Sequence, residues 1–324
     1  MLRGMDLSQV TLTQMRYALA VEETRSFRAA AERSHVSQSG LSMQIQKLEE
    51  LLELRLFDRS KKPVLVTPEG EPALRQMRAV LRETERLGQV IAERDELSGS
   101  YRLGVIPTLA SSVLPLFLRE FLERYPRIEL TIEELQTDAI LERLRADTLD
   151  AGIAATPLNV PGSQETPLGY EPFFAYLPPD DPLLRKKSVS EADLSARELW
   201  VMPEGHCFRT QVLSFCNAPA FTASSRVHFE SGSFETLVRL VDKGLGATIL
   251  PALVVQQLPS ERRDAQVRRL AGPTPTREIG LVIARADWRG SVNAALAELV
   301  RERLDEALGP KPRRSVVLSP MGGD

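Results

Sequence analysis

Cysteine and histidine are scarce in this chain, which has 2 cysteines and 3 histidines among 324 residues. The sequence indicates no metal site, and no cofactor is expected. No run approaches the roughly 18 apolar residues that a membrane-spanning helix needs, so no membrane partner is expected either. The first six residues lack the apolar stretch of a signal peptide. We therefore expect a cytoplasmic protein, in which a stable structural disulfide is not expected and a transient one would be informative.

Size and charge leave the class of protein open. The chain is too long for one ordinary core, which predicts two or three domains. Its composition, 43% hydrophobic and 26% charged, is typical of a soluble globular protein. The net charge is −3, and residues 1–67 hold 10 Lys and Arg against 8 Asp and Glu. Charge alone therefore does not predict a partner made of nucleic acid.

Three short helices are predicted in a row between residues 12 and 52. Ser26 and Ser37 precede the second and third helices and are expected to cap them. The third helix has apolar residues on one face and short polar side chains on the other, which suit base edges and phosphates in a major groove. The candidate DNA contacts are Ser26, Arg28, Ser37, Gln38, Ser39, Ser42, Gln44, Lys47 and Arg59.

A wing and a long helix follow. Residues 56–67 would form the wing, with Arg59, Lys61 and Lys62 available to phosphates. Pro68 then starts a helix in which apolar residues recur at alternating steps of four and three. This spacing predicts a coiled-coil seam, and hence a dimer with two recognition helices on neighbouring half-sites. The seam residues are Ala73, Met77, Val80, Thr84, Leu87 and Ile91.

The pattern changes at Tyr101 to one of α/β type. Strands are predicted at 101–106, 128–135 and 149–155, and helices at 111–124 and 138–146. This alternation predicts a parallel sheet flanked by helices. The chain enters a second such unit near Tyr170 and returns near Gly272 to a strand at 279–284 and a helix at 293–308. Two crossings imply two subdomains with a cleft and a hinge between them.

We accordingly divide the chain into a winged helix-turn-helix domain (1–67), a linker and dimerisation helix (68–97) and a regulatory domain (98–309). Residues 170–271 are expected to form the second subdomain of the regulatory domain. Ser98, Gly99 and Ser100 are expected to act as a flexible hinge. Residues 310–324 contain Pro and Gly and have no period, so a disordered tail is expected there.

The first third resembles the LysR-type transcriptional regulators. The matching residues are Ser26-Phe27, Ala29-Ala30, Val36-Ser37-Gln38, Leu41-Ser42, Ile45, Lys47-Leu48-Glu49, Leu56-Phe57 and Arg59. The resemblance implies double-stranded promoter DNA as a partner, RNA polymerase as a second one, a homotetramer, and a regulatory domain with the periplasmic-binding-protein architecture. Residues 244–251 resemble the glycine-rich segment of the family and are interpreted as structural. Glu53 departs from the family, which normally has Gly there; a left-handed turn would cost about 1 kcal/mol.

The two cysteines lie in the segment from Gly205 to Cys216. His206 and Arg209 flank Cys207 and would favour the reactive thiolate. Nine residues of helix put the Cα atoms of Cys207 and Cys216 roughly 13.5 Å apart, whereas a disulfide needs them within about 7 Å. Joining the two thiols would therefore require the helix to unwind. The alternative is that Cys216 is simply a small core residue on an apolar helical face.

The second region resembles the hydrogen-peroxide sensors of the same family. The matching segments are Gly104-Val105-Ile106-Pro107-Thr108, Glu134-Leu135-Gln136-Thr137, the stretch from Gly205 to Cys216, His228-Phe229, Glu235-Thr236-Leu237 and Ile279-Gly280-Leu281-Val282. The resemblance implies that Cys207 is the peroxidatic thiol and Cys216 the resolving one. It also implies a peroxide pocket made of Thr108, Thr137, His206, Arg209 and His228. Thr210 departs from the acidic residue common in these sensors.

The function implied is a transcriptional activator, not an enzyme, that responds to hydrogen peroxide through a disulfide between Cys207 and Cys216. Three alternatives stay open on the sequence. The cleft could bind a small organic effector, Cys207 could act without a partner thiol, or the chain could be a thiol peroxidase. The last alternative leaves the helix-turn-helix third without a role.

Overall fold

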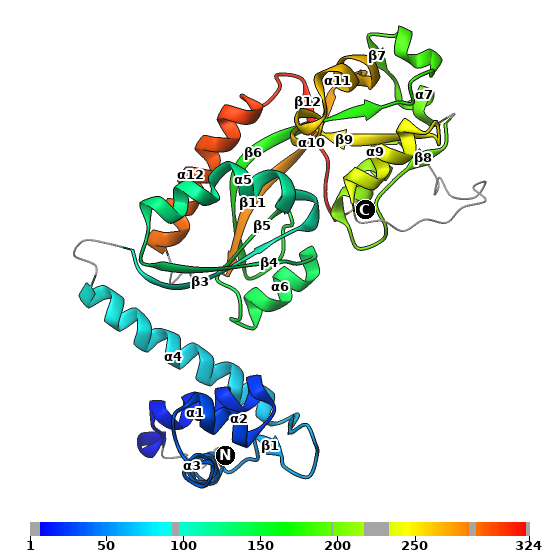
Figure 1. Cartoon of the computed structure of the whole chain (residues 1–324). Coiled ribbons are helices and arrows are strands. Elements are labelled where there is room, and N and C mark those ends of the chain that lie inside the picture. Colours follow the sequence, from blue (N-terminus) through cyan, green and yellow to red (C-terminus); the bar gives the residue numbers. More distant parts are fainter. Residues whose placement is uncertain (1–6, 93–96, 196, 217–232, 285–289, 322–324) are drawn as a thin grey trace. The chain divides into compact units, whose positions relative to one another are not determined.

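The computed structural model describes residues 7–92, 97–195, 197–216, 233–284 and 290–321 (Figure 1). The chain divides into two compact units, residues 1–95 and residues 96–324. Each unit has its own hydrophobic core and is described by itself. Among the helices so described, none combines the length and apolar character needed to cross a membrane.

The first unit is a helical domain with a small two-stranded hairpin. Its elements are η1 (Leu7–Gln9), α1 (Leu12–Thr24), α2 (Phe27–Arg33), α3 (Gln38–Leu51), β1 (Phe57–Asp58), β2 (Leu65–Val66) and α4 (Gly70–Ala92). The predicted caps are confirmed: the Ser26 hydroxyl accepts a hydrogen bond from the Ala29 amide at 3.3 Å, and Ser37 accepts one from Gly40 at 3.1 Å. Leu41, Ile45 and Leu48 of α3 are fully buried, as the predicted apolar face requires.

Helix α4 packs along α1 and contributes to the core of the first unit. Leu74 is fully buried, and Met77 is 5% exposed within the same core. The Met77 side chain is therefore packed within its own chain, and its assignment to a dimer contact stays a prediction. A seven-residue apolar period is equally suited to packing within one chain, and here α1 is the neighbour. Val80 and Thr84 are half-buried, whereas the side chains of Leu87 and Ile91 lie outside the described residues.

The second unit has an α/β fold with two subdomains. The elements of the first subdomain, with its returning strand and helix, are β3 (Gly99–Val105), α5 (Pro107–Arg124), β4 (Ile128–Glu134), α6 (Thr137–Arg145), β5 (Ala151–Thr156), β11 (Thr274–Ala284) and α12 (Gly290–Leu308). Strand β6 (Ser163–Tyr176) runs from the first subdomain into the second. The other elements of the second subdomain are η2 (Pro182–Arg185), β7 (Ser188–Val189), α7 (Glu191–Ser195), β8 (Leu199–Trp200), α8 (Cys207–Cys216), α9 (Phe234–Asp242), β9 (Ala247–Pro251), α10 (Ala252–Gln257), α11 (Ser260–Gln266), β10 (Val267–Leu270) and β12 (Ser315–Val317).

The two subdomains are joined by the long strands β6 and β11, which pair with each other antiparallel. In the first subdomain β3 pairs parallel with β4 and β5, as the β-α-β-α-β order predicts. The parallel arrangement stops there, because β11 returns from the second subdomain and runs antiparallel to β5. The far end of β6 pairs with β9 and β10 in the second subdomain. The two predicted crossings are thus confirmed as two strands.

Three local expectations are corrected by this fold. Residues 99 and 100 do not form a hinge, because both belong to β3 and pair with Ile128 and Glu129 of β4. Helix α5 begins at Pro107 rather than at residue 111, because proline is well suited to the first turn of a helix. The tail is not disordered between residues 310 and 321: β12 pairs parallel with the start of β11, and Leu318 is buried in the core of the second subdomain.

Candidate functional site

The predicted recognition face of the first unit lies on α3. Gln38, Ser39, Gln44 and Lys47 are all exposed on it, and Ser42 is half-buried. These positions agree with the predicted polar face. The Gln44 side-chain oxygen also accepts a hydrogen bond from Gln14 of α1 at 3.2 Å, which restricts that amide.

The remaining candidates for DNA contact have partners of their own. The hydroxyl oxygens of Ser26 and Ser37 accept the cap hydrogen bonds described above. Arg28 is exposed and pairs with Glu32 one helical turn away at 3.0 Å.

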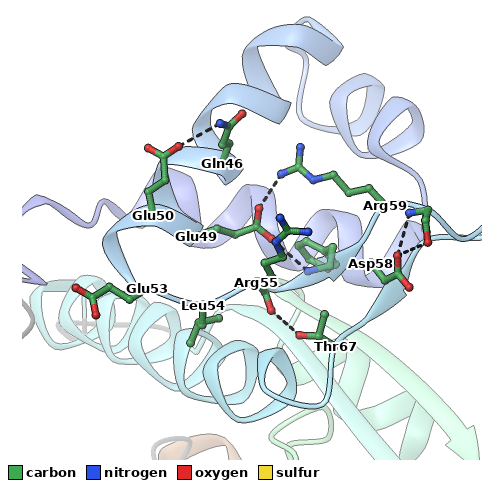
Figure 2. Close-up of a pocket in the computed structure, with 11 residues that line it drawn as sticks. Gln46, Glu49, Glu50, Glu53, Leu54, Arg55, Asp58, Arg59 and Thr67 are labelled. Atoms are coloured by element: carbon green, nitrogen blue, oxygen red, sulfur yellow. Dashed lines mark hydrogen bonds and ion pairs between the residues drawn. The ribbon is translucent and has the colours of Figure 1, made fainter.

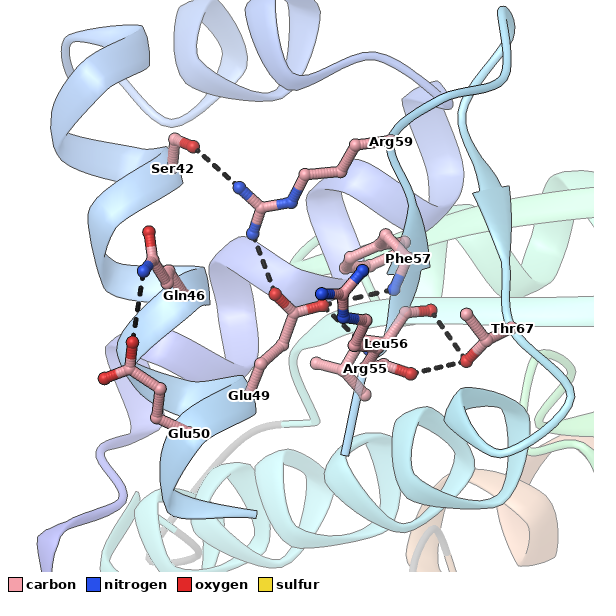
Figure 3. Close-up of polar contacts among 9 residues, drawn as sticks. All are labelled: Ser42, Gln46, Glu49, Glu50, Arg55, Leu56, Phe57, Arg59 and Thr67. Carbon is pink, nitrogen blue, oxygen red and sulfur yellow. Dashed lines mark hydrogen bonds and ion pairs between the residues drawn. The ribbon is translucent and has the colours of Figure 1, made fainter. Parts of the chain in front are cut away.

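Glu49 joins the recognition helix to the wing. One of its carboxylate oxygens accepts hydrogen bonds from the Leu56 and Phe57 amides at 2.8 and 3.2 Å, and the other forms an ion pair with Arg59 at 2.8 Å (Figure 3). Arg59 also donates to the Ser42 hydroxyl at 3.2 Å and lies 4.8 Å from the centre of the Phe27 ring. The Arg59 guanidinium, which was expected to contact phosphate, is therefore engaged by Glu49 and Ser42 on the surface of the domain, where its side chain is 38% exposed.

A pocket lies between the end of α3 and the hairpin (Figure 2). Its lining combines four carboxylates with two arginines. The residues that line it are Gln46, Glu49, Glu50, Glu53, Leu54, Arg55, Phe57, Asp58, Arg59, Ser60 and Thr67. Glu53 has a φ angle of 51°, so the left-handed turn anticipated at this position is present on a non-glycine residue.

In the second unit, Cys207 is the first residue of α8 and is buried among core residues of the first subdomain, whereas Cys216 ends the same helix in the core of the second subdomain. Both thiols are free. The helix keeps their Cα atoms roughly 13.5 Å apart. Helix α8 therefore connects two separately packed regions of the unit, with one sulfur in each.

The cation that the structure brings to Cys207 is Arg277 of β11, which the sequence did not reveal. Burial raises the pKa of the Cys207 thiol. The positive charge of Arg277, the Thr137 hydroxyl and the backbone N–H groups of Phe208 and Cys207 lower this pKa, but by less than burial raises it. Charge thus favours the thiolate through Arg277, but desolvation outweighs it in this conformation; a contribution from His206 and Arg209 stays a prediction.

Arg277 belongs to a fully buried network. Its guanidinium forms an ion pair with Glu171 of β6 at 2.6 Å, and neither side chain has any exposed surface. The same guanidinium donates to the Thr108 hydroxyl at 3.2 Å and to the Thr108 backbone carbonyl at 3.1 Å. It therefore connects the first turn of α5 with both strands that cross between the subdomains.

The residues predicted to form the peroxide pocket lie in different environments. Thr108 and Thr137 are both buried, and the Thr137 hydroxyl has no hydrogen bond of good geometry to any residue the structure describes. Burial lowers the pKa of His206, so this imidazole is neutral at pH 7. Arg209 donates to the Met202 carbonyl at 3.1 Å. His228 lies outside the described residues.

Both units match models of known families. Residues 12–71 match the bacterial regulatory helix-turn-helix protein of the lysR family, and residues 94–305 match the LysR substrate binding domain. The chain belongs to the LysR family of transcriptional regulators. The helix-turn-helix of a LysR-family protein is a DNA-binding domain, so α3 and the hairpin are the surface on which to look for DNA contacts.

Individual relatives of this LysR-family chain agree over nearly its whole length. It is 36% identical over 298 residues to the DNA-binding transcriptional dual regulator OxyR of Escherichia coli K12, covering 91% of this chain and 96% of the relative. It is 35% identical over 295 residues to a probable hydrogen peroxide-inducible genes activator of Mycobacterium leprae, covering 91% and 94%. These relatives are transcriptional regulators.

Solved structures give the same result. Full-length OxyR from Pseudomonas aeruginosa, a cysteine-to-aspartate variant, superimposes with a TM-score of 0.75 at 30% identity, covering 94% of this chain and 100% of that one. A hydrogen-peroxide-bound cysteine-to-serine variant of OxyR from Corynebacterium glutamicum gives a TM-score of 0.61 at 28% identity, covering 95% and 98%. The order of helix-turn-helix domain and LysR substrate-binding domain is therefore that of full-length OxyR proteins.

Proposed function

We propose that this LysR-family protein is a transcriptional activator that senses hydrogen peroxide through Cys207. The proposal rests above all on the grouping of the buried Cys207 thiol with the buried Thr137 hydroxyl and the cation of Arg277, whose guanidinium lies 5.5 Å from the ring of the adjacent Phe208. It is further supported by relatives whose names describe hydrogen-peroxide-inducible genes activators. Thr108 completes the set, since Arg277 donates to its hydroxyl.

The chemistry begins at the sulfur of Cys207. Its thiolate attacks one peroxide oxygen, the O–O bond breaks, and hydroxide leaves and takes up the thiol proton as water. Cys207 is thereby oxidised to a sulfenic acid and peroxide is reduced. Arg277 supplies a positive field for the sulfur, and the threonine hydroxyls can donate to the oxygen on which negative charge develops. A small neutral oxidant suits a site as buried as this one.

The second step is a disulfide with Cys216. The Cys216 sulfur attacks the sulfenic sulfur, the S–S bond forms, and the sulfenic oxygen leaves as water. With roughly 13.5 Å between the Cα atoms along an intact α8, at least part of this helix must unwind first. The oxidised protein would then differ from the reduced one around α8, at the surface of the regulatory domain.

Transcriptional output would follow from that difference through a homo-oligomer. A dimer formed through α4 would place two α3 helices on neighbouring half-sites of promoter DNA. A changed contact between regulatory domains, in the homotetramer that the family resemblance implies, would alter the spacing of these helices. Contacts with RNA polymerase would complete activation.

A non-reducing tryptic map tests the proposal. Cleavage after Arg197, Arg209 and Arg226 separates Cys207 and Cys216, so their disulfide appears as one linked mass after about one equivalent of hydrogen peroxide. A fast and reducible link is the expected result. Sulfenylated Cys207 without a link would support a sensor with one active cysteine.

Two variants control the experiment, Cys207→Ser and Cys216→Ser. The first should lose all reaction with peroxide and keep DNA binding. The second should retain sulfenylation and lose the link. Absence of oxidation in the unmodified protein, together with stabilisation by a small organic effector, would overturn the proposal.

A further inference from the structure

The two strands that cross between the subdomains carry opposite charges at their most buried point. Glu171 lies on β6 and Arg277 on β11, and both side chains have 0% exposed surface. Charged side chains are almost never fully buried unless they are paired. This ion pair lies beside the candidate reactive thiol of Cys207.

The contacts fix the Arg277 guanidinium from two sides. On one side, one oxygen of Glu171 accepts hydrogen bonds from its Nε and Nη2 atoms at 2.7 and 2.6 Å. On the other side, Nη1 and Nη2 donate to Thr108. The second oxygen of Glu171 accepts from the Leu253 amide at 2.7 Å, which holds the carboxylate itself in place. With both ends held, the guanidinium has one orientation available relative to Cys207.

We propose that Glu171 is a positioning residue for Cys207: it holds Arg277 against Thr108 and offsets part of the cation's field, thereby setting how readily the Cys207 sulfur ionises and reacts. The inference deepens the proposed function and rests on it for its biological meaning. The claim about ionisation stands on its own, because it depends only on the charges around the thiol.

The charged and polar groups around the Cys207 thiol determine whether loss of the Glu171 charge raises or lowers the pKa of this thiol. The Arg277 guanidinium of β11 lies 5.5 Å from the ring centre of Phe208, the residue after Cys207, and is paired with Glu171 of β6. Thr137 of α6 contributes a neutral hydroxyl. On α8 and the residue before it, His206 is neutral at pH 7 and Arg209 is held by the Met202 carbonyl. Among the residues that the structure describes, Arg277 is the cation that acts on the sulfur, and Glu171 is the carboxylate paired with it.

Removing the negative charge of Glu171 should strengthen the field of Arg277 at the sulfur. Glu171→Gln keeps the shape of the side chain and its acceptor for the Leu253 amide but removes the charge. A purely structural role for the ion pair predicts a less stable protein with unchanged ionisation of Cys207. A positioning role predicts a shift in the pH at which the thiolate forms.

The experiment measures thiolate absorbance near 240 nm against pH in the full-length reduced protein. All variants carry Cys216→Ser, and the same protein with Cys207→Ser is subtracted to remove tyrosine absorbance. The expected result for Glu171→Gln is a titration midpoint lower by about one pH unit, which raises the thiolate fraction, and the rate of peroxide reaction at pH 7, about tenfold. An unchanged or higher midpoint in the folded variant would overturn the proposal.

The chain offers a matched control on the same strand. Glu165 of β6 accepts hydrogen bonds from the Leu158 and Asn159 amides at 2.8 and 2.9 Å. Glu165→Gln therefore repeats the change of charge at an amide-bound carboxylate elsewhere on β6. Its midpoint should equal that of the parent.

A second variant tests the proposal even if Glu171→Gln, which leaves Arg277 without its ion pair, does not fold. The double change Glu171→Gln and Arg277→Met leaves no unpaired charge in the core. Its midpoint should lie above that of the parent, because burial then acts without an opposing cation. A double-variant midpoint equal to the parent's would also overturn the proposal.

The same data separate this inference from the proposed function. If Cys207 fails to react with peroxide in every variant while Glu171→Gln lowers the midpoint, peroxide sensing fails and the role of Glu171 stands. If Cys207 reacts with peroxide and the titration midpoint is unchanged by Glu171→Gln, the proposed role of Glu171 is wrong and the proposed function stands.

Discussion

The side-chain amide of Gln211 donates a hydrogen bond to the backbone carbonyl of Leu318 at 2.8 Å. Gln211 is fully buried in the middle of α8, and Leu318 directly follows β12. The Leu318 amide in turn donates to the Thr276 carbonyl of β11 at 2.9 Å. The C-terminal segment is therefore attached both to a strand that crosses between subdomains and to the helix that separates the two cysteines.

The first prediction concerns this attachment. Leu318→Ala should lower the free energy of unfolding of the reduced protein by about 2 kcal/mol, because it removes a buried side chain from the core of the second subdomain. Chemical denaturation followed by fluorescence measures the change. Val316→Ala is the matched control, since Val316 lies in the same segment and is 43% exposed; a loss there as large as at Leu318 would contradict the assignment.

The second prediction concerns phosphate contacts of the wing. Because Arg59 is engaged by Glu49 and Ser42, Arg59→Ala should weaken binding to random-sequence duplex DNA without changing the slope of log affinity against log salt. Lys61→Ala and Lys62→Ala, which alter exposed residues, should each reduce the magnitude of the slope by about 0.9 per protomer. Fluorescence anisotropy at several salt concentrations gives the slopes. A reduced slope for Arg59→Ala would show that the guanidinium leaves Glu49 for phosphate.

The third prediction concerns the turn after α3. Glu53 has a φ of 51°, a conformation that glycine adopts without steric cost. Glu53→Gly should therefore stabilise the first unit by about 1 kcal/mol. Glu50→Gly, within α3, should destabilise it by about the same amount. Thermal unfolding that moved in the same direction for both variants would argue against a left-handed turn at Glu53.

The fourth prediction concerns pH. Burial, with a smaller contribution from Glu191, raises the pKa of Cys216 from 9.0 to about 12. A thiol whose pKa is higher in the folded state favours folding fully below pH 9, the unfolded value, and this contribution is lost as the pH rises toward 12. The free energy of unfolding should therefore fall across this range.

Cys216→Ala isolates that contribution. Tyr176 also has a pKa raised by burial and acts in the same direction, so both proteins should lose stability at high pH. The loss should be smaller for Cys216→Ala than for the parent in urea titrations between pH 8 and pH 11. Equal losses would mean that the Cys216 thiol is not buried as described.

Local features of the fold were predictable from the sequence because they depend on neighbouring residues. The serine caps at Ser26 and Ser37 and the turn at Glu53 each follow from a few adjacent side chains and one backbone conformation. The seam on α4 shows the limit of such reasoning. The period of its apolar residues is the same whether the partner is a second chain or α1, so it did not show that Met77 packs in the core of its own unit.

Features that join distant parts of the chain were missed. Glu171 and Arg277 are 106 residues apart, and each resembles an ordinary exposed charge in its own strand. Only the pairing of β6 with β11 brings them together. The tail was missed for a similar reason: three residues of β12 carry little pattern of their own, and their partner lies on β11. The cation at Cys207 was consequently sought in the adjacent sequence, at Arg209, instead of across the sheet.

The placement of the two sulfurs in separate cores bears on how a peroxide signal would end. A bond between Cys207 and Cys216 requires at least one sulfur to leave the side chains that now surround it. Those side chains would lose their packing partner, so the linked protein stores free energy that the reduced protein does not. Disulfides with such strain are reduced more readily than structural ones. The burial of both thiols in the reduced fold would therefore also favour reduction of the disulfide by cellular thiols. Reduction would return the protein to its resting state.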